Sequence, residues 1–287
     1  MNIAVVGAGT VGAATGFGLQ SKRHAIIFSD IDESILTNLR GRGHSTGTVE
    51  EAARKAEIIM VCVPTPTFSG HFILSHVLDA CAQIGKALRD SLSYKVVVIR
   101  STVIPFSTRS SLIPILEKES ERKAGLDFGI CMNPEFLRES TALEDFLLPD
   151  RIIIGQLDKH SGDLLESVYQ PFERPILRCS LEEAELSKYV ANGFLACKIS
   201  YFNEVHNICK KLGTDSRVVS LAVSLDRRIG SYGTEGGRPF DGKCLPKDVE
   251  AFLKSISELG ENFEVLSAAE KVNRRALPKI MAEARHG

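Results

Sequence analysis

The stretch that decides the fold of this chain is NIAVVGAGTVG, residues 2–12. Residues 2–6 form a short apolar run, and the pattern becomes helical directly after the glycines. The spacing of Gly7, Gly9 and Gly12 allows a tight turn and lets the backbone approach a pyrophosphate at the start of the following helix. A strand, this turn and a helix, in that order, form the context that the dinucleotide-binding motif requires.

An acidic residue completes the predicted cofactor site. Asp30 lies at the end of the second apolar run, residues 25–28. A carboxylate at this place accepts hydrogen bonds from the ribose hydroxyls of an adenosine and repels a 2′-phosphate. We therefore expect NAD rather than NADP, held also by Thr10 and Val11 in the turn. The turn by itself leaves FAD open, because FAD uses the same turn.

Outward from this motif, short apolar runs alternate with helical patterns along the first half of the chain. Further strands are expected at residues 57–63, 95–99, 128–132 and 151–155. Their near-continuous apolar character is typical of a buried parallel sheet. The sequence predicts an α/β fold, with a Rossmann-like, doubly wound parallel sheet in an NAD-binding domain of residues 1–175.

After this domain the strands stop and helical patterns follow. Ser180 and Glu183 form a capping box, and the helical pattern that starts there continues without proline to Leu212. A helix of this length is long for a globular domain, so we expect it to span or brace two units. Shorter helices are expected at residues 215–225, 246–259 and 263–283. We predict an all-helical substrate and dimerisation domain at residues 176–287.

The overall composition is that of an ordinary globular protein. Hydrophobic residues make up 44% of the chain and charged residues 25%, and the net charge of −1 favours neither nucleic acid nor an anionic membrane surface. No apolar run approaches the length of a membrane span. Seven cysteines without a Cys-x-x-Cys pair argue against a disulfide framework and a zinc knuckle. We expect a cytoplasmic protein with reduced thiols, without a metal site and without nucleic-acid or membrane partners.

One cysteine stands where chemistry is favoured. Cys244 directly precedes Leu245 and Pro246, at the start of a predicted helix. The helix dipole and the unpaired backbone N–H groups at such a place favour the thiolate, which attacks carbonyls. Alone, a cysteine is more often a small buried hydrophobe. Together with the dinucleotide motif, it suggests a dehydrogenase that takes an alcohol past the aldehyde to the acid.

Two polar residues share one face of the long predicted helix. Lys188 and Asn192 are four positions apart, the spacing that brings side chains together on a helix. An amine and a carboxamide that point into a cleft can hold a substrate oxygen as it becomes negative. For an isolated pair, a solvated lysine beside a surface asparagine is the commoner situation.

Taken together, the motifs closely resemble the UDP-glucose/GDP-mannose 6-dehydrogenase family, over nearly the whole chain. Besides the dinucleotide turn, the matching stretches are VCVPTP (61–66), STV (101–103), NPEFLRE (133–139), PDRIIIG (149–155), ELSKYVAN (185–192), NE (203–204), RIG (228–230) and CLPKD (244–248). The resemblance implies a four-electron oxidation of a primary alcohol to a carboxylate, with two NAD⁺ used in sequence. It also implies a small, sugar-type substrate.

The resemblance implies a role for each catalytic residue. Lys188 and Asp248 assist the deprotonation of the substrate hydroxyl through a water. Cys244 captures the aldehyde as a thiohemiacetal, and a second oxidation gives a thioester. Lys188 with Asn192 stabilises the oxyanions on either side of the thioester.

The same family resemblance implies which residues take part in hydrolysis of the thioester and in binding of the cofactor and the substrate. Glu135, helped by Thr102 in ordering water, activates the water that hydrolyses the thioester. The resemblance places Val63, Pro64, Thr65, Ser101, Thr102 and Glu139 in the cofactor site. It places Glu135, Phe136, Leu137, Arg138, Lys188, Asn192, Arg228 and Lys243 in the substrate site. Two of these keep alternatives: Glu139 can instead form a structural ion pair, and Arg228, which resembles an arginine that reaches across a dimer interface, can be a surface charge.

The chain departs from the family in two respects. The family has a third, nucleotide-sugar-binding domain after the central helix, whereas this sequence ends at Gly287, so it resembles a short form, either natural or truncated. The turn before the cysteine usually reads GFGGSC and here reads PFDGKC, residues 239–244. Proline and aspartate reduce backbone freedom, and Lys243 places a cation beside the thiol. The substrate is then either the usual sugar nucleotide or a smaller sugar phosphate or nucleoside with a primary hydroxyl.

Two other functions are compatible with parts of the sequence. A two-electron dehydrogenase of the β-hydroxyacid or 6-phosphogluconate type shares the Rossmann domain and the Lys-x-x-x-Asn pair, but it needs neither Cys244 nor the NPE segment. A non-catalytic NAD-sensing protein is the other rival.

We also expect a homodimer through the helix at 263–283, which offers an apolar face of Phe263, Leu266, Ala269 and Ile280.

Overall fold

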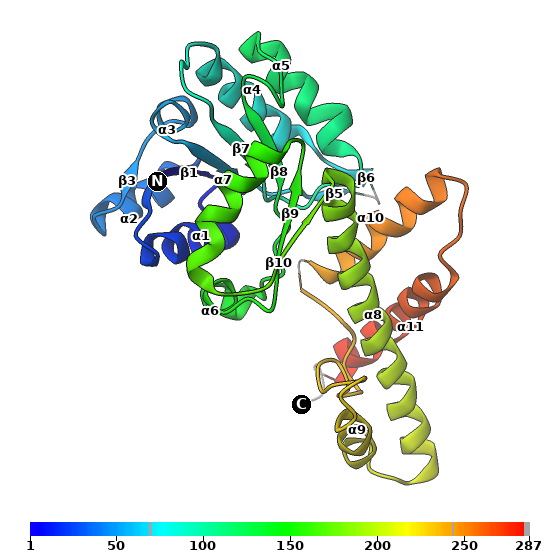
Figure 1. The fold of residues 1–287 in the computed structure, drawn as a ribbon. Helices are drawn as coiled ribbons and strands as arrows, with labels where there is room; N and C mark the ends of the chain where they lie inside the picture. The colour runs from blue at the N-terminus through cyan, green and yellow to red at the C-terminus, as the bar shows by residue number, and fades with distance from the viewer. Residues whose placement is uncertain (69–70, 243, 284–287) are drawn as a thin grey trace. The chain divides into compact units, whose positions relative to one another are not determined.

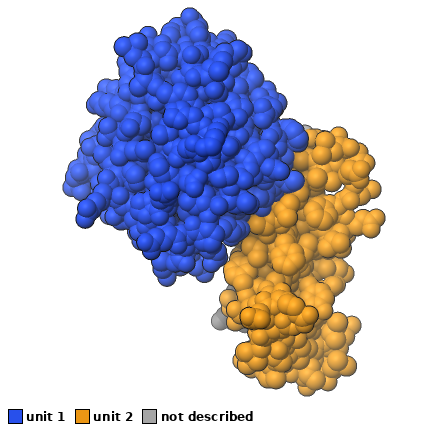
Figure 2. Space-filling model, in the orientation of Figure 1, with its two compact units in different colours: residues 1–66, 72–188 blue, residues 67–71, 189–287 orange. Residues whose placement is uncertain are grey.

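The computed structural model describes residues 1–68, 71–242 and 244–283 (Figure 1). The chain forms two compact units, which are coloured separately in Figure 2. Unit 1 consists of Met1–Pro66 and Phe72–Lys188, and unit 2 of Thr67–His71 and Tyr189–Gly287. The division lies within a long helix, whereas the sequence analysis placed the domain boundary after residue 175.

Unit 1 is built on one large sheet. Its eight strands are β1 (Asn2–Val6), β2 (Ala25–Ser29), β3 (Ser45–Thr46), β4 (Ile58–Val61), β7 (Val96–Ile99), β8 (Gly129–Met132), β9 (Ile152–Gln156) and β10 (Ile176–Cys179), in the spatial order β10-β9-β8-β7-β4-β1-β2-β3. Neighbouring strands are parallel, except that β9 runs antiparallel to β8. The predicted α/β fold with a doubly wound parallel sheet is confirmed, apart from the antiparallel pair of β8 and β9.

Strand β10 lies beyond the point at which the sequence analysis expected strands to stop. It is a four-residue strand at the edge of the sheet, and Leu177 is exposed on it. A strand that is not buried on both faces lacks the continuous apolar run by which the inner strands were recognised. A short hairpin of β5 (Thr67–Phe68) and β6 (His71–Phe72) was likewise not expected.

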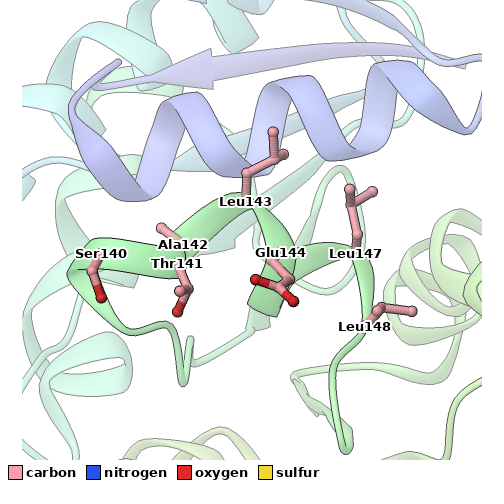
Figure 3. Close-up of a pocket in the computed structure, with 7 residues that line it drawn as sticks. All are labelled: Ser140, Thr141, Ala142, Leu143, Glu144, Leu147 and Leu148. Atoms are coloured by element: carbon pink, nitrogen blue, oxygen red, sulfur yellow. The ribbon is translucent and has the colours of Figure 1, made fainter.

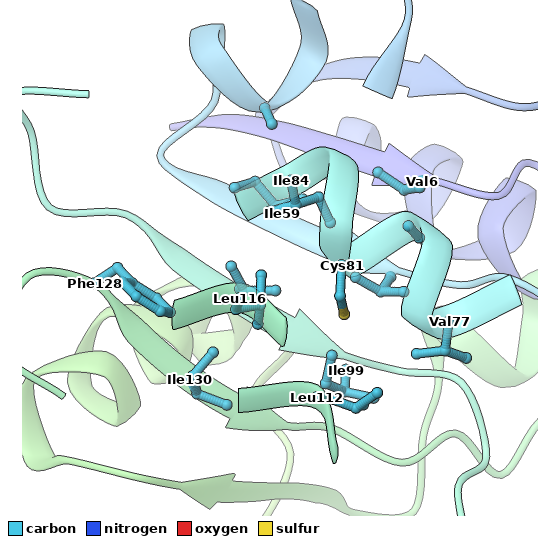
Figure 4. Close-up of a cluster of buried hydrophobic side chains, with 14 of the residues drawn as sticks. Val6, Ile59, Val77, Cys81, Ile84, Ile99, Leu112, Leu116, Phe128 and Ile130 are labelled. Carbon is cyan, nitrogen blue, oxygen red and sulfur yellow. The ribbon is translucent and has the colours of Figure 1, made fainter. Parts of the chain in front are cut away.

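Helices cover both faces of the sheet (Figure 1). They are α1 (Thr10–Ser21), α2 (Glu33–Gly41), α3 (Val49–Lys55), α4 (Ser75–Arg89), a π-helical turn η1 (Thr108–Leu112) that continues into α5 (Ile113–Ser120), a 3₁₀ turn η2 (Glu139–Thr141), α6 (Ala142–Leu147), α7 (Lys159–Tyr169) and a 3₁₀ turn η3 (Gln170–Phe172). Because successive strand residues point to opposite faces, β1 sends Ala4 and Val6 into the core under α3, α4 and α5 (Figure 4). It sends Ile3 and Val5 into the core under α1, α6 and α7.

Unit 2 is helical. It contains most of α8 (Leu181–Leu212), together with α9 (Ser216–Ser224), α10 (Leu245–Glu258) and α11 (Glu264–Glu283). The predicted capping box at the start of α8 is confirmed, because the Ser180 N–H donates to the Glu183 carboxylate and the Glu183 N–H donates to Ser180 Oγ. With 32 residues, α8 is about 48 Å long.

Helix α11 uses part of its apolar face inside unit 2. Leu266 and Ala269 are 0% and 6% exposed, and a Cβ added at Gly193 of α8 would lie 3.5 Å from Leu266. Phe263 stays partly exposed, and the side chain of Ile280 lies outside the described residues. Leu266 and Ala269 therefore serve the core of their own unit. Within the described residues, no helix combines the length and apolar character that crossing a membrane requires.

Candidate active site

The dinucleotide turn has the backbone that its glycines predict. Gly7 has φ +89°, and a Cβ at Gly12 would lie 1.8 Å from the Gly7 carbonyl oxygen, so neither position accepts a side chain. A Cβ at Gly9, by contrast, would meet no protein atom within 4 Å. The protein itself therefore leaves room at Gly9, beside the N-terminus of α1, where a pyrophosphate is expected to bind.

Asp30 lies beside this turn. Its Oδ2 accepts a hydrogen bond of 2.6 Å from the Ala8 N–H, and its Oδ1 accepts one of 2.9 Å from the Asp32 N–H. The carboxylate thus holds the turn in shape. The open position at Gly9 and the acid beside it fit the diphosphate and the ribose of NAD.

Five of the other predicted cofactor residues follow the carboxyl ends of β4 and β7. Val63, Pro64 and Thr65 begin two positions after the end of β4, and Ser101 and Thr102 begin two positions after the end of β7. The Ser101 hydroxyl donates to the Val63 carbonyl at 2.7 Å, so the two loops are tied together. Carboxyl ends of parallel strands are where open α/β sheets bind their ligands.

The NPE segment follows β8, and the buried side chain of Arg100 holds its first residue, Asn133. Arg100 is 5% exposed and donates from Nη1 to Asn133 Oδ1 at 2.5 Å and from Nε to Thr15 Oγ1 at 2.9 Å. Tyr169 donates a further bond of 2.6 Å to Asn133 Oδ1, and Asn133 Nδ2 donates to the Ile153 carbonyl at 2.8 Å. Asn133 is therefore a structural residue. Sequence analysis missed Arg100, whose only signal was its place directly before Ser101.

Glu135 and Lys188 form a buried ion pair in unit 1. The Lys188 Nζ lies 3.0 Å from Glu135 Oε1 and 2.6 Å from the Glu135 carbonyl oxygen, and the two residues are 3% and 7% exposed. Burial works to raise the pKa of Glu135, but the charge of Lys188, the Leu137 N–H and Arg100 outweigh it and hold this pKa below its usual value. Glu135 is therefore a carboxylate at neutral pH.

Asn192 and Asp248 form a second buried pair, in unit 2. Asn192 Nδ2 donates to Asp248 Oδ2 at 2.6 Å, and Lys247 Nζ lies 2.8 Å from Asp248 Oδ1. Asp248 is 2% exposed and lies in the first turn of α10, where its N–H donates to the Cys244 carbonyl at 2.9 Å. Cys244 is the exposed N-cap residue of α10. The structure thus places the thiol one helical turn from a buried carboxylate.

The helix α8 carries a member of each pair. Lys188 and Asn192 are four residues apart on this one continuous helix, as the sequence predicts. Each of them already holds a carboxylate in its own unit. Unit 1 thus offers an amine and a carboxylate, and unit 2 offers a thiol, a carboxylate and a carboxamide; oxidation through a covalent intermediate needs groups of these kinds.

The other predicted substrate residues are engaged in different ways. The Phe136 ring lies 5.5 Å from Lys188 Nζ and 3.8 Å from the Arg151 guanidinium. Leu137 is partly buried. Arg138 pairs with Asp145, with 3.0 Å between Nε and Oδ2, and Glu139 is exposed at the start of η2. Arg228 is exposed and pairs with Asp226 at 2.6 Å, and Lys243 lies outside the described residues.

A separate hollow of about 610 Å³ lies along α6 (Figure 3). It is lined by Ser140, Thr141, Ala142, Leu143, Glu144, Leu147 and Leu148. Glu144 is the one ionisable residue of this lining. The hollow therefore lacks the groups that the predicted chemistry requires.

Comparisons with known proteins agree with these observations. The model of the UDP-glucose/GDP-mannose dehydrogenase family matches with its NAD binding domain at residues 36–173 and with its central domain at residues 182–275. A GDP-mannose 6-dehydrogenase of Pseudomonas savastanoi pv. phaseolicola is 37% identical over 95% of this chain and 68% of the relative. The UDP-glucose 6-dehydrogenase YwqF of Bacillus subtilis (strain 168) is 33% identical over 99% of this chain and 68% of that protein.

A solved structure is similar as well. A UDP-glucose dehydrogenase from the hyperthermophilic archaeon Pyrobaculum islandicum superposes with a TM-score of 0.90 at 34% identity. The match covers 95% of this chain and 68% of the other.

Proposed function

Because the chain belongs to the UDP-glucose/GDP-mannose dehydrogenase family, it is an NAD-dependent dehydrogenase that acts on CH–OH groups, and we propose that it oxidises a nucleotide sugar to the acid. The substrate is the primary alcohol of a sugar of the UDP-glucose or GDP-mannose type. The reaction is a four-electron oxidation that consumes one water and two NAD⁺ and releases two NADH. Its product is a carboxylate.

One observation favours a four-electron oxidation over a two-electron oxidation. Cys244 is exposed at the N-cap of α10, one turn before the buried Asp248 that Asn192 holds at 2.6 Å. A simple alcohol dehydrogenase has no use for a nucleophile at this place. The N-terminus of a helix favours the thiolate, which is the form that attacks an aldehyde.

The residues divide the chemistry among themselves. When bound, NAD accepts hydride from the alcohol carbon. Asp248 and Lys188 take up the hydroxyl proton through a water. Cys244 Sγ then bonds to the aldehyde carbon and gives a thiohemiacetal. This becomes a thioester when it loses its hydroxyl proton and gives up the hydride from its carbon to a second NAD⁺. Lys188 and Asn192 stabilise the oxyanions that precede and follow it.

Hydrolysis ends the cycle. Glu135, ionised at neutral pH, removes a proton from a water that Thr102 helps to order. This water adds to the thioester carbon, the C–S bond breaks, and the thiolate of Cys244 is regenerated. Covalent capture keeps the half-oxidised aldehyde in place until the second NAD⁺ has bound.

A smaller substrate is a second candidate, favoured by the loop before the cysteine. The backbone N–H and carbonyl of Phe240 both bond to the side chain of Asn273, at 2.7 and 2.9 Å, and both residues are buried. This fixed segment precedes Asp241 and Gly242 and differs from a glycine-rich turn. A sugar phosphate or a nucleoside with a primary hydroxyl then replaces the nucleotide sugar.

A substrate panel tests the proposal. UDP-glucose, GDP-mannose and glucose 1-phosphate are each incubated with the protein and NAD⁺ while NADH and the carboxylate product are quantified. We expect turnover of one nucleotide sugar with two NADH for each carboxylate. One NADH with a ketone or aldehyde product supports the β-hydroxyacid type of dehydrogenase instead, and bound NAD without any turnover supports the non-catalytic rival.

We also propose a homodimer. On α8, six large apolar side chains are exposed, namely Leu186, Val190, Phe194, Tyr201, Ile208 and Leu212. Neighbouring members of this set are four or seven residues apart, which places them along one side of the helix. An apolar stripe of this kind suits a second copy of the chain. The cytoplasmic location expected from the cysteine content stays a prediction.

A further inference from the structure

A buried carboxylate next to the proposed machinery has no assigned role. Glu185 lies on α8, three residues before Lys188, and is 0% exposed. Both of its oxygens accept hydrogen bonds from backbone N–H groups of unit 1. Oε2 accepts from Phe106 at 2.5 Å, and Oε1 accepts from Thr108 at 2.8 Å. With both oxygens bound to the backbone and no exposure, Glu185 does not reach a reacting atom.

The segment that Glu185 holds is strained. Phe106 has φ +73°, in the left-handed region that favours glycine, and its side chain is 61% exposed. A non-glycine residue keeps such a backbone only when its surroundings impose it. The Phe106 ring is too exposed to impose it by packing. Hydrogen bonds hold this backbone instead: the Phe106 N–H donates to Glu185 Oε2 at 2.5 Å, and the Ser107 N–H donates to the Ile104 carbonyl at 3.0 Å.

The two hydrogen bonds from Phe106 and Thr108 to Glu185, together called the clamp, also cap a helix. Thr108 is the first residue of η1, which continues through α5 to Ser120. A carboxyl oxygen at a helix N-terminus accepts hydrogen bonds from N–H groups that have no partner within the helix. Glu185 therefore fixes the start of this helix as well as the strained residue before it.

The same segment begins at Thr102. At its near end, Ser101 is tied to the loop after β4 through the Val63 carbonyl, at 2.7 Å. At its far end, Glu185 ties it to α8, and one helical turn later Lys188 ties α8 to the NPE segment. Thr102 thus lies in a short segment with both ends fixed, and α8 holds the loops after β7 and β8 together.

We propose that Glu185 is a positioning residue that keeps Thr102 in place by clamping the strained backbone at Phe106 to α8. The inference rests on the proposed function for the role of Thr102, whereas the clamp itself does not depend on it. Substituting Glu185→Gln keeps the size of the side chain but leaves one acceptor oxygen for two N–H donors. The segment then relaxes away from the conformation that Phe106 resists.

The test combines this variant with a change that removes the strain. In the full chain, Glu185→Gln is expected to lower kcat for acid formation by about 10- to 100-fold while the substrate KM changes little. Phe106→Gly in the same chain recovers most of the loss, because glycine adopts φ +73° without strain. Phe106→Ala does not recover it, since alanine loses the ring but keeps the strain.

A matched control separates the clamp from a general loss of contacts. Glu182→Gln removes the ion pair with Arg109, an exposed link between the same two segments at 2.5 Å, and is expected to leave kcat within about twofold. Equal losses from Glu182→Gln and Glu185→Gln would overturn the proposal. So would the failure of Phe106→Gly to reduce the effect of Glu185→Gln.

Melting temperatures test the clamp independently of any enzymatic activity. Glu185→Gln is expected to lower the Tm clearly, and the fall is at least halved when Phe106 is glycine. An equal fall in both backgrounds would refute the clamp, whatever the enzyme oxidises. If the wild-type protein oxidises no alcohol, the proposed function fails, and the melting temperatures still give the answer for Glu185.

Discussion

Lys188 and Glu135 form a buried ion pair, and neither member can be removed alone without cost. Replacing Lys188 by Met leaves a carboxylate that is 7% exposed without its cation. Breaking a buried pair in this way typically costs about 3–5 kcal/mol. We expect Lys188→Met to lower the free energy of unfolding by this order, as measured by chemical denaturation, and Lys188→Met/Glu135→Gln to recover part of it. If Lys188→Met is as stable as the wild type, the ion pair with Glu135 does not contribute to stability as described.

The same pair predicts a pH dependence. The pKa of Glu135 is lower in the folded protein than its usual value, so the unfolded state binds the proton more readily. The stabilisation by ionised Glu135 is therefore fully present above the usual pKa and is lost as the pH falls through the lowered, folded-state pKa. Comparing the Tm of wild type and Glu135→Gln across acidic pH should show a steeper fall in the wild type. Parallel curves would argue against it.

Single residues of the site were predictable from sequence to different degrees. Lys188 and Asn192 share a helix face, which follows from their spacing alone. Cys244 and Asp248 lie in one helical turn for the same reason. Arg100 and Glu185 were missed, because no local sequence pattern predicts such distant contacts. Asn133 lies 33 positions from Arg100, and the two donors to Glu185 lie 79 and 77 positions from it.

At the scale of elements, the turn before α1 makes a prediction that separates folding from cofactor binding. A Cβ at Gly9 meets no protein atom within 4 Å, whereas one at Gly12 lies 1.8 Å from the Gly7 oxygen. Gly9→Ala should leave the Tm unchanged and weaken NAD binding, because the methyl group occupies the space for the pyrophosphate. Gly12→Ala should lower the Tm as well. Calorimetric titration with NAD measures the affinity.

The outcome for Gly9→Ala is the informative one. If it binds NAD as tightly as the wild type, the pyrophosphate does not approach the backbone there, and the placement of the cofactor in this turn is wrong.

Elements differed in how far the sequence revealed them. The inner strands were found from their apolar runs, because each is buried on both faces. The edge strand β10 was missed, since Leu177 and its neighbours are only partly covered. The long helix α8 was found from its capping box and its uninterrupted pattern, and the structure confirms both.

At the scale of the whole molecule, the apolar stripe on α8 predicts self-association. Phe194 and Tyr201 are 68% and 65% exposed, a large apolar area to leave in water. Phe194→Glu should convert a dimer into a monomer in light scattering after size-exclusion chromatography. Leu259→Glu is the control, because Leu259 is equally exposed at the end of α10. A wild-type monomer, or a dimer that persists in Phe194→Glu, would remove the stripe as the interface.

The homodimer expected through the helix at residues 263–283 stays a prediction, although part of the apolar face of this helix is buried within unit 2. The pattern of α11 contains Leu266 and Ala269 at helical spacing, but a pattern does not show whether a face is covered by the same chain or left for another. In the structure these two residues belong to the core of unit 2. The domain boundary after residue 175 stays a prediction.

The central claim is that Cys244 carries the aldehyde on to the acid, and the yield of NADH per molecule of product tests it most directly. With a nucleotide sugar that the wild-type protein oxidises, we predict two NADH for each carboxylate formed. Cys244→Ala should form no acid, retain its Tm because the residue is exposed, and release at most one NADH per sugar. Two NADH per carboxylate from Cys244→Ala at the wild-type rate would contradict the account.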